Sequence, residues 1–261
     1  MTKLIDTHSH PQFLQYDSDR AEMLARMRAR DVSTIAVGTE YKTSADGVVL
    51  AEKEEGIWAT IGVHPNDSEE LFDAKKFEKL LSPKVVAIGE CGLDYYRSDR
   101  AKDGSRQKEN FEAQINFALA HNLPLMLHVR ASQGTQNAHE DALDILESYQ
   151  KENGEKVRGT AHFFTGSLDT AKRYWGLGFA VSFPGVITFA REYDEIVRAA
   201  PKGLMLSETD APYAAPLPYR GKRNEPAYVE EVVRKIAELR GAGYEETAAQ
   251  LCANAARIFR I

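Results

Sequence analysis

Near its start the chain reads Lys3-Leu4-Ile5-Asp6-Thr7-His8-Ser9-His10, a β-strand pattern that carries two histidines. The histidines are two positions apart, so in an extended strand both imidazoles point to the same face. Two neutral imidazoles on one face can bind one metal ion. A hydrolytic metal site takes about three to five nitrogen and oxygen ligands, so the rest of the chain must supply the others.

Composition indicates one large domain. The chain has 261 residues, 43% of them hydrophobic, and a barrel of alternating strands and helices commonly spans about 250 residues as a single domain. We therefore expect residues 1–261 to form one domain. No apolar run reaches the roughly 18 residues that cross a bilayer, and Met1-Thr2-Lys3 leads straight into the strand without a signal peptide. A cytoplasmic protein without a membrane partner is predicted.

Cysteine content and net charge narrow the function classes. Cys91 and Cys252 lie far apart, which indicates neither a disulfide framework nor a thiolate zinc site, so histidine and carboxylate would hold any metal. The net charge of −6 argues against a protein that coats nucleic acid non-specifically. It leaves room for an enzyme that acts locally on a strand end.

Hydrophobic periodicity alternates between short β-branched runs and longer amphipathic segments. Strands are expected at residues 4–8, 33–38, 58–63, 85–90, 125–129, 159–163, 180–182 and 204–208. Helices are expected at residues 19–30, 44–54, 69–81, 107–121, 140–152, 167–177, 189–199, 226–240 and 244–259. Eight such units predict an α/β fold of the (β/α)8 TIM barrel type. The alternative is an open doubly wound sheet, which is disfavoured because Thr7-His8-Ser9-His10-Pro11 stands where a glycine-rich phosphate loop belongs.

Metal-ligand residue types recur where the predicted strands end. The residues are His8 and His10, His64, Glu90, His128, His162 and Asp210. Alone, a strand histidine is more often a hydrogen-bonded structural residue, and a carboxylate can cap a helix or join an ion pair. Together they favour a metal site, because the carboxyl ends of barrel strands converge on the rim where such enzymes keep their active sites. The polar loops at residues 95–105 and 211–224 belong to the same rim.

Six motifs carry a resemblance to a known family. They are Asp6-Thr7-His8-Ser9-His10, Gly62-Val63-His64-Pro65, Ile88-Gly89-Glu90-Cys91-Gly92-Leu93-Asp94-Tyr95, His128-Val129-Arg130, His162-Phe163-Phe164-Thr165-Gly166 and Glu208-Thr209-Asp210-Ala211-Pro212-Tyr213. The set resembles that of the TatD family of metal-dependent deoxyribonucleases, within the amidohydrolase superfamily, over nearly the whole chain. Two departures are Phe163, where many relatives have cysteine, and residues 131–137, a stretch a few residues longer than usual.

The resemblance implies two divalent cations, with magnesium, manganese and zinc as the candidates. By similarity, His8, His10 and Asp210 would bind one ion, His128 and His162 the other, and Glu90 would bridge them. A bridging carboxylate suits cations about 3.5 to 4 Å apart, because it offsets their repulsion. Asp210 would then accept the proton of the attacking water as general base.

Four residues are predicted to contact substrate. His64 would donate to a phosphate oxygen or protonate the leaving group, and Arg130 would bind phosphate through both guanidinium nitrogens. A structural histidine and an ion pair with a nearby carboxylate are the alternatives. Tyr95, in the run from Tyr95 to Lys108, and Arg223, in Tyr219-Arg220-Gly221-Lys222-Arg223, belong to segments that mix aromatic rings with positive charge and would guide a nucleic acid strand. Such segments are also typical of solvated loops.

Three functions stay open at this point. The first is a metal-dependent deoxyribonuclease that cleaves phosphodiester bonds of DNA, as an exonuclease on single strands, with DNA as a transient partner and no obligate protein partner. The second is an amide or ester hydrolase of deacylase or deaminase type, because a metal-activated water attacks carbonyl carbon equally well. The third is a binding module with an inert metal. Basic residues on the rim favour the first.

Overall fold

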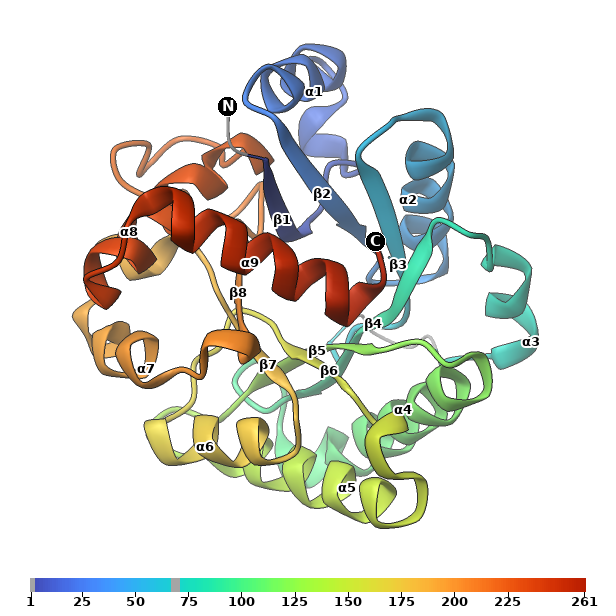
Figure 1. Cartoon of the computed structure of the whole chain (residues 1–261). Coiled ribbons are helices and arrows are strands. Elements are labelled where there is room, and N and C mark those ends of the chain that lie inside the picture. The colour runs from blue at the N-terminus through green and yellow to red at the C-terminus, as the bar shows by residue number, and fades with distance from the viewer. Residues whose placement is uncertain (1–2, 67–70) are drawn as a thin grey trace.

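Eight parallel strands form one sheet whose order follows the chain, from β1 to β8 (Figure 1). This computed structural model describes residues 3–66 and 71–261. The strands are β1 Leu4–Ser9, β2 Val32–Val37, β3 Ile57–Ile61, β4 Val85–Asp94, β5 Leu125–Arg130, β6 Gly159–Ala161, β7 Ala180–Phe183 and β8 Met205–Ser207. A sequential strand order excludes the doubly wound sheet, whose order reverses at a switch point.

The first and last strands meet, which closes the sheet into a barrel. Ser9 forms a parallel bridge with Ala211, just beyond β8. The His10 amide donates to the Ala211 carbonyl at 2.7 Å, and the Asp210 amide donates to the His8 carbonyl at 2.9 Å. The predicted single-domain TIM barrel is confirmed.

Helices surround the barrel. They are α1 Arg20–Ala29, α2 Tyr41–Lys53, α3 Ala74–Phe77, α4 Arg100–His121, α5 Asn137–Asn153, α6 Leu168–Gly176, α7 Asp194–Ala199, α8 Val229–Arg240 and α9 Tyr244–Phe259. Figure 1 shows α9 lying across one end of the barrel instead of along its side. Its Ala255, Ile258 and Phe259 pack in one buried cluster with Ile5 and Met126 from the amino-terminal halves of strands. The amino-terminal end is thus sealed by apolar packing, and the carboxyl end is left for chemistry.

Three predicted helices begin at positions that differ from the structure by five residues or more. The helix expected at residues 69–81 begins at Ala74, where the Asp73 carboxylate caps it by accepting from the amides of Lys75 and Lys76; residues 67–70 lie outside the described residues. The loop expected at residues 95–105 is half helical, because α4 begins at Arg100. The helix expected at residues 189–199 is one short 3₁₀ turn, Arg191–Tyr193, followed by α7.

The second of these errors comes from polarity. Residues 95–105 are rich in polar side chains, which predicted a loop, but α4 begins among them at Arg100, and the Asp99 carboxylate caps it by accepting from the Ala101 amide. Gly104 is buried inside α4, and a Cβ there would lie 3.6 Å from the Tyr95 hydroxyl, an ordinary van der Waals distance. Local polarity therefore did not show where the helix begins.

Strand β4 is longer than predicted and contains an irregularity. It was expected to end at Glu90 but pairs with β5 as far as Asp94, which lies opposite Arg130. Between Ile88 and Cys91 two residues of β4, Gly89 and Glu90, face one of β5, as in a β-bulge. Gly89 permits this, because a Cβ there would lie 2.3 Å from the Met126 carbonyl oxygen. A bulge re-aims side chains, and this one directs Glu90 toward the barrel axis.

No helix within the described part of the chain combines the length and the apolar character that a membrane span requires.

Thr209 connects the two strands that close the barrel through its side chain, so a substitution there tests how much this contact stabilises the fold. Its hydroxyl donates to Asp6 Oδ2 at 2.7 Å, and its amide donates to Asp6 Oδ1 at 2.8 Å; both residues are fully buried. Thr209→Val keeps the shape but leaves one carboxyl oxygen short of a donor, so the free energy of unfolding should fall by about 1 to 3 kcal/mol. Urea denaturation measures the loss. Thr135→Val, on an exposed loop, should change it by less than about 0.5 kcal/mol.

Candidate metal centre

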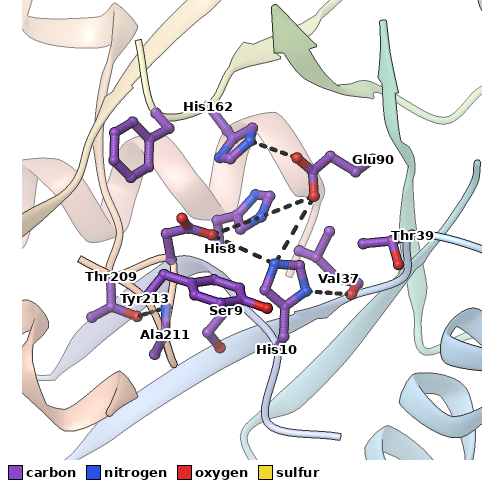
Figure 2. A network of polar contacts seen from close by, with 12 residues as sticks. His8, Ser9, His10, Val37, Thr39, Glu90, His162, Thr209, Ala211 and Tyr213 are labelled. Atoms are coloured by element: carbon purple, nitrogen blue, oxygen red, sulfur yellow. Dashed lines mark hydrogen bonds and ion pairs between the residues drawn. The ribbon is translucent and has the colours of Figure 1, made fainter. Parts of the chain in front are cut away.

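Three of the predicted ligands meet at the barrel seam. His8 and His10 come from the end of β1, and Figure 2 shows them together with Glu90 and His162. Asp210 follows β8. Asp210 Oδ1 lies 3.7 Å from His8 Nε2 and 3.5 Å from His10 Nε2. One ligand atom from each residue lies within 4.8 Å of the others, a spacing at which a single cation can contact all three.

Glu90 lies between this group and a second one. Its Oε2 is 3.5 Å from His8 Nε2 and 3.9 Å from His10 Nε2. Its Oε1 is 2.8 Å from both His128 Nδ1 and His162 Nε2. Each carboxylate oxygen therefore faces a different pair of imidazoles, which is the geometry required of a bridging ligand.

The tautomer of His10 suits metal binding. Its Nδ1 donates to the Val37 carbonyl at 2.8 Å, so Nε2 keeps its lone pair and faces the two carboxylates. Neither ring nitrogen of His8 has a hydrogen-bond partner among the described residues, although the side chain is fully buried. Buried polar atoms normally have partners. A cation between His8 Nε2, Asp210 and Glu90 would supply the missing one, so these residues fit a divalent metal.

Electrostatics at the site agree with this assignment. Burial lowers the pKa of His8 to about 4, so that imidazole is neutral at neutral pH and can ligate. Burial alone would raise the pKa of Glu90, but the neighbouring His162, His64 and His128 hold it well below its usual range. The carboxylates Glu90, Asp210, Asp94 and Glu208 raise the pKa of His10, His128 and His162, so these imidazoles compete for protons as well as for a metal. Binding of divalent ions to the ionised Glu90 and its histidines would therefore release protons.

His64 also faces the cluster. Its Nε2 is 3.6 Å from Glu90 Oε1, and its Nδ1 accepts from the Asn66 amide at 3.1 Å. The ring proton is thus on Nε2, which points into the cavity as a donor. Burial and the nearby His128 lower the pKa of His64 to about 3. This favours the predicted hydrogen bond to a phosphate oxygen over protonation of a leaving group.

Two carboxylates that the sequence analysis left without a role hold the ligands in place. Asp94 Oδ2 lies 3.0 Å from His128 Nε2, which leaves His128 Nδ1 for the metal. Glu208 Oε1 lies 3.4 Å from His162 Nδ1 and accepts from the Phe163 amide at 2.7 Å. Their positions in the motifs, four after Glu90 and two before Asp210, were the available signal. Strand spacing alone did not show which imidazole each would meet.

A cavity of about 580 Å³ opens above the cluster. His64, Glu90, His128 and Asp210 line it, together with Arg130. The Arg130 guanidinium lies 3.8 Å from the centre of the Tyr96 ring, and no ion pair involves it among residues 3–66 and 71–261. The alternative of an ion pair with a neighbouring carboxylate is therefore not found there.

Two predicted substrate contacts lie elsewhere, which corrects the expectation for Tyr95 and Arg223. Tyr95 is buried and its hydroxyl donates to Asp141 at 2.9 Å. Arg223 donates to both carboxylate oxygens of Asp19, at 2.7 and 2.6 Å. Neither lines the cavity, and Arg97 does so instead. Charge and aromatic content correctly indicated which loops border the cavity, but not which of their side chains point into it.

Comparison with known proteins settles the family. The model of a family described as TatD related DNase matches residues 5–260. The chain belongs to the TatD family. The TatD resemblance read from the motifs is confirmed, and the protein is a metal-dependent hydrolase whose buried histidine and carboxylate clusters can hold two divalent ions.

Individual TatD relatives match over almost their full length. An uncharacterized metal-dependent hydrolase, YabD of Bacillus subtilis, is 41% identical, with 99% of each chain covered. A protein of Pantoea vagans named 3'-5' ssDNA/RNA exonuclease TatD is 34% identical over 95% of each chain. The crystal structure of YJJV, a TatD homolog from Escherichia coli, superposes with a TM-score of 0.88 at 29% identity, covering 99% of this chain and 98% of that one.

Asp94→Asn tests how the TatD centre is held. Asp94 Oδ1 accepts from the amides of Tyr96 and Arg97, so the asparagine oxygen would keep that position and the NH₂ group, which cannot accept, would face His128 Nε2. One of the two metal ions should then bind about tenfold more weakly, while the ion at His8, His10 and Asp210 is unaffected. Calorimetric titration of stripped protein with manganese or zinc measures both affinities. Asp141→Asn is the matched control, because that carboxylate pairs with Arg100 and Lys108 outside the cavity. Equal affinities in all three proteins would contradict the role of Asp94.

Proposed function

We propose that this TatD protein is a metal-dependent phosphodiesterase that removes nucleotides from an end of single-stranded DNA. The observation that carries the proposal is the pairing, in one cavity, of a histidine and carboxylate metal centre with two arginines, Arg97 and Arg130. A guanidinium is the side chain best matched to phosphate, whereas a neutral amide or ester gains nothing from it.

Each group of residues in the site would have a separate role in hydrolysis. Divalent ions held by the six predicted ligands would lower the pKa of a bound water and stabilise the leaving oxygen. Asp210 lines the cavity beside His8 and His10, where its carboxylate can accept the proton of the attacking water. His64 Nε2–H and the two arginines would hold phosphate oxygens, which fixes the direction of attack.

The shape of the site supports an end-directed reaction. A cavity of about 580 Å³ has the size of a pocket for one small molecule and lies at the mouth of a barrel sealed below by α9. It is a recess and suits a strand end better than the middle of a duplex. The name of the Pantoea vagans relative, a 3'-5' exonuclease on single-stranded DNA and RNA, supports an end-directed reaction, suggests that it starts at the 3' end, and admits RNA as a second substrate. A cytoplasmic location stays a prediction.

Metal removal and restoration test the reaction. Chelator-stripped protein should not degrade end-labelled single-stranded DNA, and magnesium, manganese or zinc should restore release of mononucleotides. Glu90→Gln should stay inactive with every metal, because the amide loses the charge that faces both imidazole groups. Circular dichroism checks that the variant is folded. Hydrolysis of an ester or amide panel, with no cleavage of DNA, would replace the proposal with the carbonyl hydrolase.

Arg130→Ala separates phosphate binding from chemistry. We expect kcat/KM on single-stranded DNA to fall about tenfold or more, through loss of a charge-assisted hydrogen bond worth about 1.5 to 3 kcal/mol. Arg220→Ala is the matched control: this guanidinium also lies 3.8 Å from an aromatic ring, that of Phe189, but outside the cavity lining. Equal losses in both variants would show that Arg130 contributes only general charge.

A further inference from the structure

The two sides of the cavity differ in chemistry. Arg97 and Arg130, from the end of β4 and from β5, form one side, which we call the arginine arc. The loops after β6, β7, β8 and β1 each contribute one aromatic ring to the other side. We call these rings the aromatic arc: Phe163, Tyr193, Tyr213 and Phe13.

Barrel order makes each arc continuous. β4 and β5 are neighbours, and β6, β7, β8 and β1 follow one another around the closed barrel. Because each loop starts at the carboxyl end of its strand, the four aromatic residues lie along one stretch of the rim. The arrangement is therefore a surface contributed by four separate segments of the chain, and no local sequence pattern produces it.

The aromatic arc adjoins the metal ligands. The Phe13 ring stacks on His10 with centroids 4.3 Å apart, and the Tyr213 ring lies 6.3 Å from the same imidazole. Phe163 lies 6.3 Å from His162. Figure 2 shows the Tyr213 ring beside His10. A planar group bound to these rings would thus lie close to the histidines that are predicted to bind the two metal ions.

The arc keeps apolar surface at the mouth of the cavity. Tyr213 is 48% exposed, and Phe13, Phe163 and Tyr193 are only partly buried. Large rings in a core would be covered, and apolar surface that stays accessible around a polar site marks a place for a ligand. The four rings carry no positive charge that would bind a second phosphate. A neutral, flat group suits this side better.

We propose that the aromatic arc binds the nucleobase of the terminal nucleotide, while the arginine arc binds the phosphates of the strand that follows. The inference rests on the proposed function and deepens it, because it assigns a direction to the nucleotide in the cavity. Every base has a π-face, so stacking holds the strand end without selecting its sequence. The site therefore binds any of the bases, and a strand end that lacks a base is a poor substrate.

Two single-stranded oligonucleotides test the arc. They are identical except at the terminal nucleotide that wild type removes first, which carries adenine in one and a tetrahydrofuran abasic analogue in the other. Wild type should have a kcat/KM about tenfold higher for the adenine end, the effect of one base–aromatic stack. Phe163→Ala and Tyr213→Ala should bring the two rates together by slowing the adenine end only. Arg97→Ala should slow both ends by the same factor.

Controls separate stacking from general damage. Tyr213→Phe keeps the ring and should retain the preference for the adenine end. Leu217→Ala removes an exposed apolar side chain from the same loop outside the cavity lining, and should change neither rate. The melting temperature of each variant checks its fold. Equal wild-type rates on the two ends, or a preference that survives both alanine substitutions, would overturn the proposal.

A binding measurement keeps this inference distinct from the nuclease reaction. If wild type cleaves neither oligonucleotide with any metal, the proposed function fails. Calorimetry with the manganese-loaded protein then compares deoxyadenosine monophosphate with deoxyribose 5-phosphate. Tighter binding of the former, lost in Phe163→Ala and Tyr213→Ala, supports a base site on its own; equal binding of the two ligands overturns it.

Discussion

The hydrogen bond from the Asp210 amide to the His8 carbonyl, 2.9 Å long, joins two segments of the chain that are about 200 residues apart in sequence. It belongs to the seam that closes the barrel, and the side chains on either side of it are predicted ligands of the same ion. Any opening of the seam would separate these ligands, so closure of the barrel and assembly of the metal site depend on the same hydrogen bonds. Asp6 and Thr209 reinforce that seam from inside the barrel.

The surroundings of the site explain how so many ionisable groups can be buried together. Apolar packing of α9 covers the amino-terminal end, and Glu90 and its histidines are buried at the bottom of a cavity at the other end. Low dielectric strengthens each interaction there and makes an unpaired charge costly. Asp94 and Glu208 hold two imidazoles from behind, which leaves the inward nitrogens of the cluster for a cation.

Much of the architecture could be predicted because it depends on short-range patterns. All eight strands were expected from β-branched runs, and the ligands from residue types at strand ends. The errors fall where packing overrides local preference. Gly104 is buried within α4 although the polar residues around it predicted a loop, and Tyr95 turns away to Asp141. Arg223 is engaged by Asp19, a residue 204 positions away that no local pattern connects to it.

By itself the sequence determined the barrel, its TatD family and the residue types of a metal centre, because strand periodicity and motif spacing are properties of contiguous segments. Only the tertiary structure decided how those residues face one another. The bulge in β4 turns Glu90 between two groups of imidazoles, and Asp94 meets His128 because β4 runs on beside β5. The aromatic arc likewise becomes continuous only once the barrel closes, since closure makes β8 and β1 neighbours.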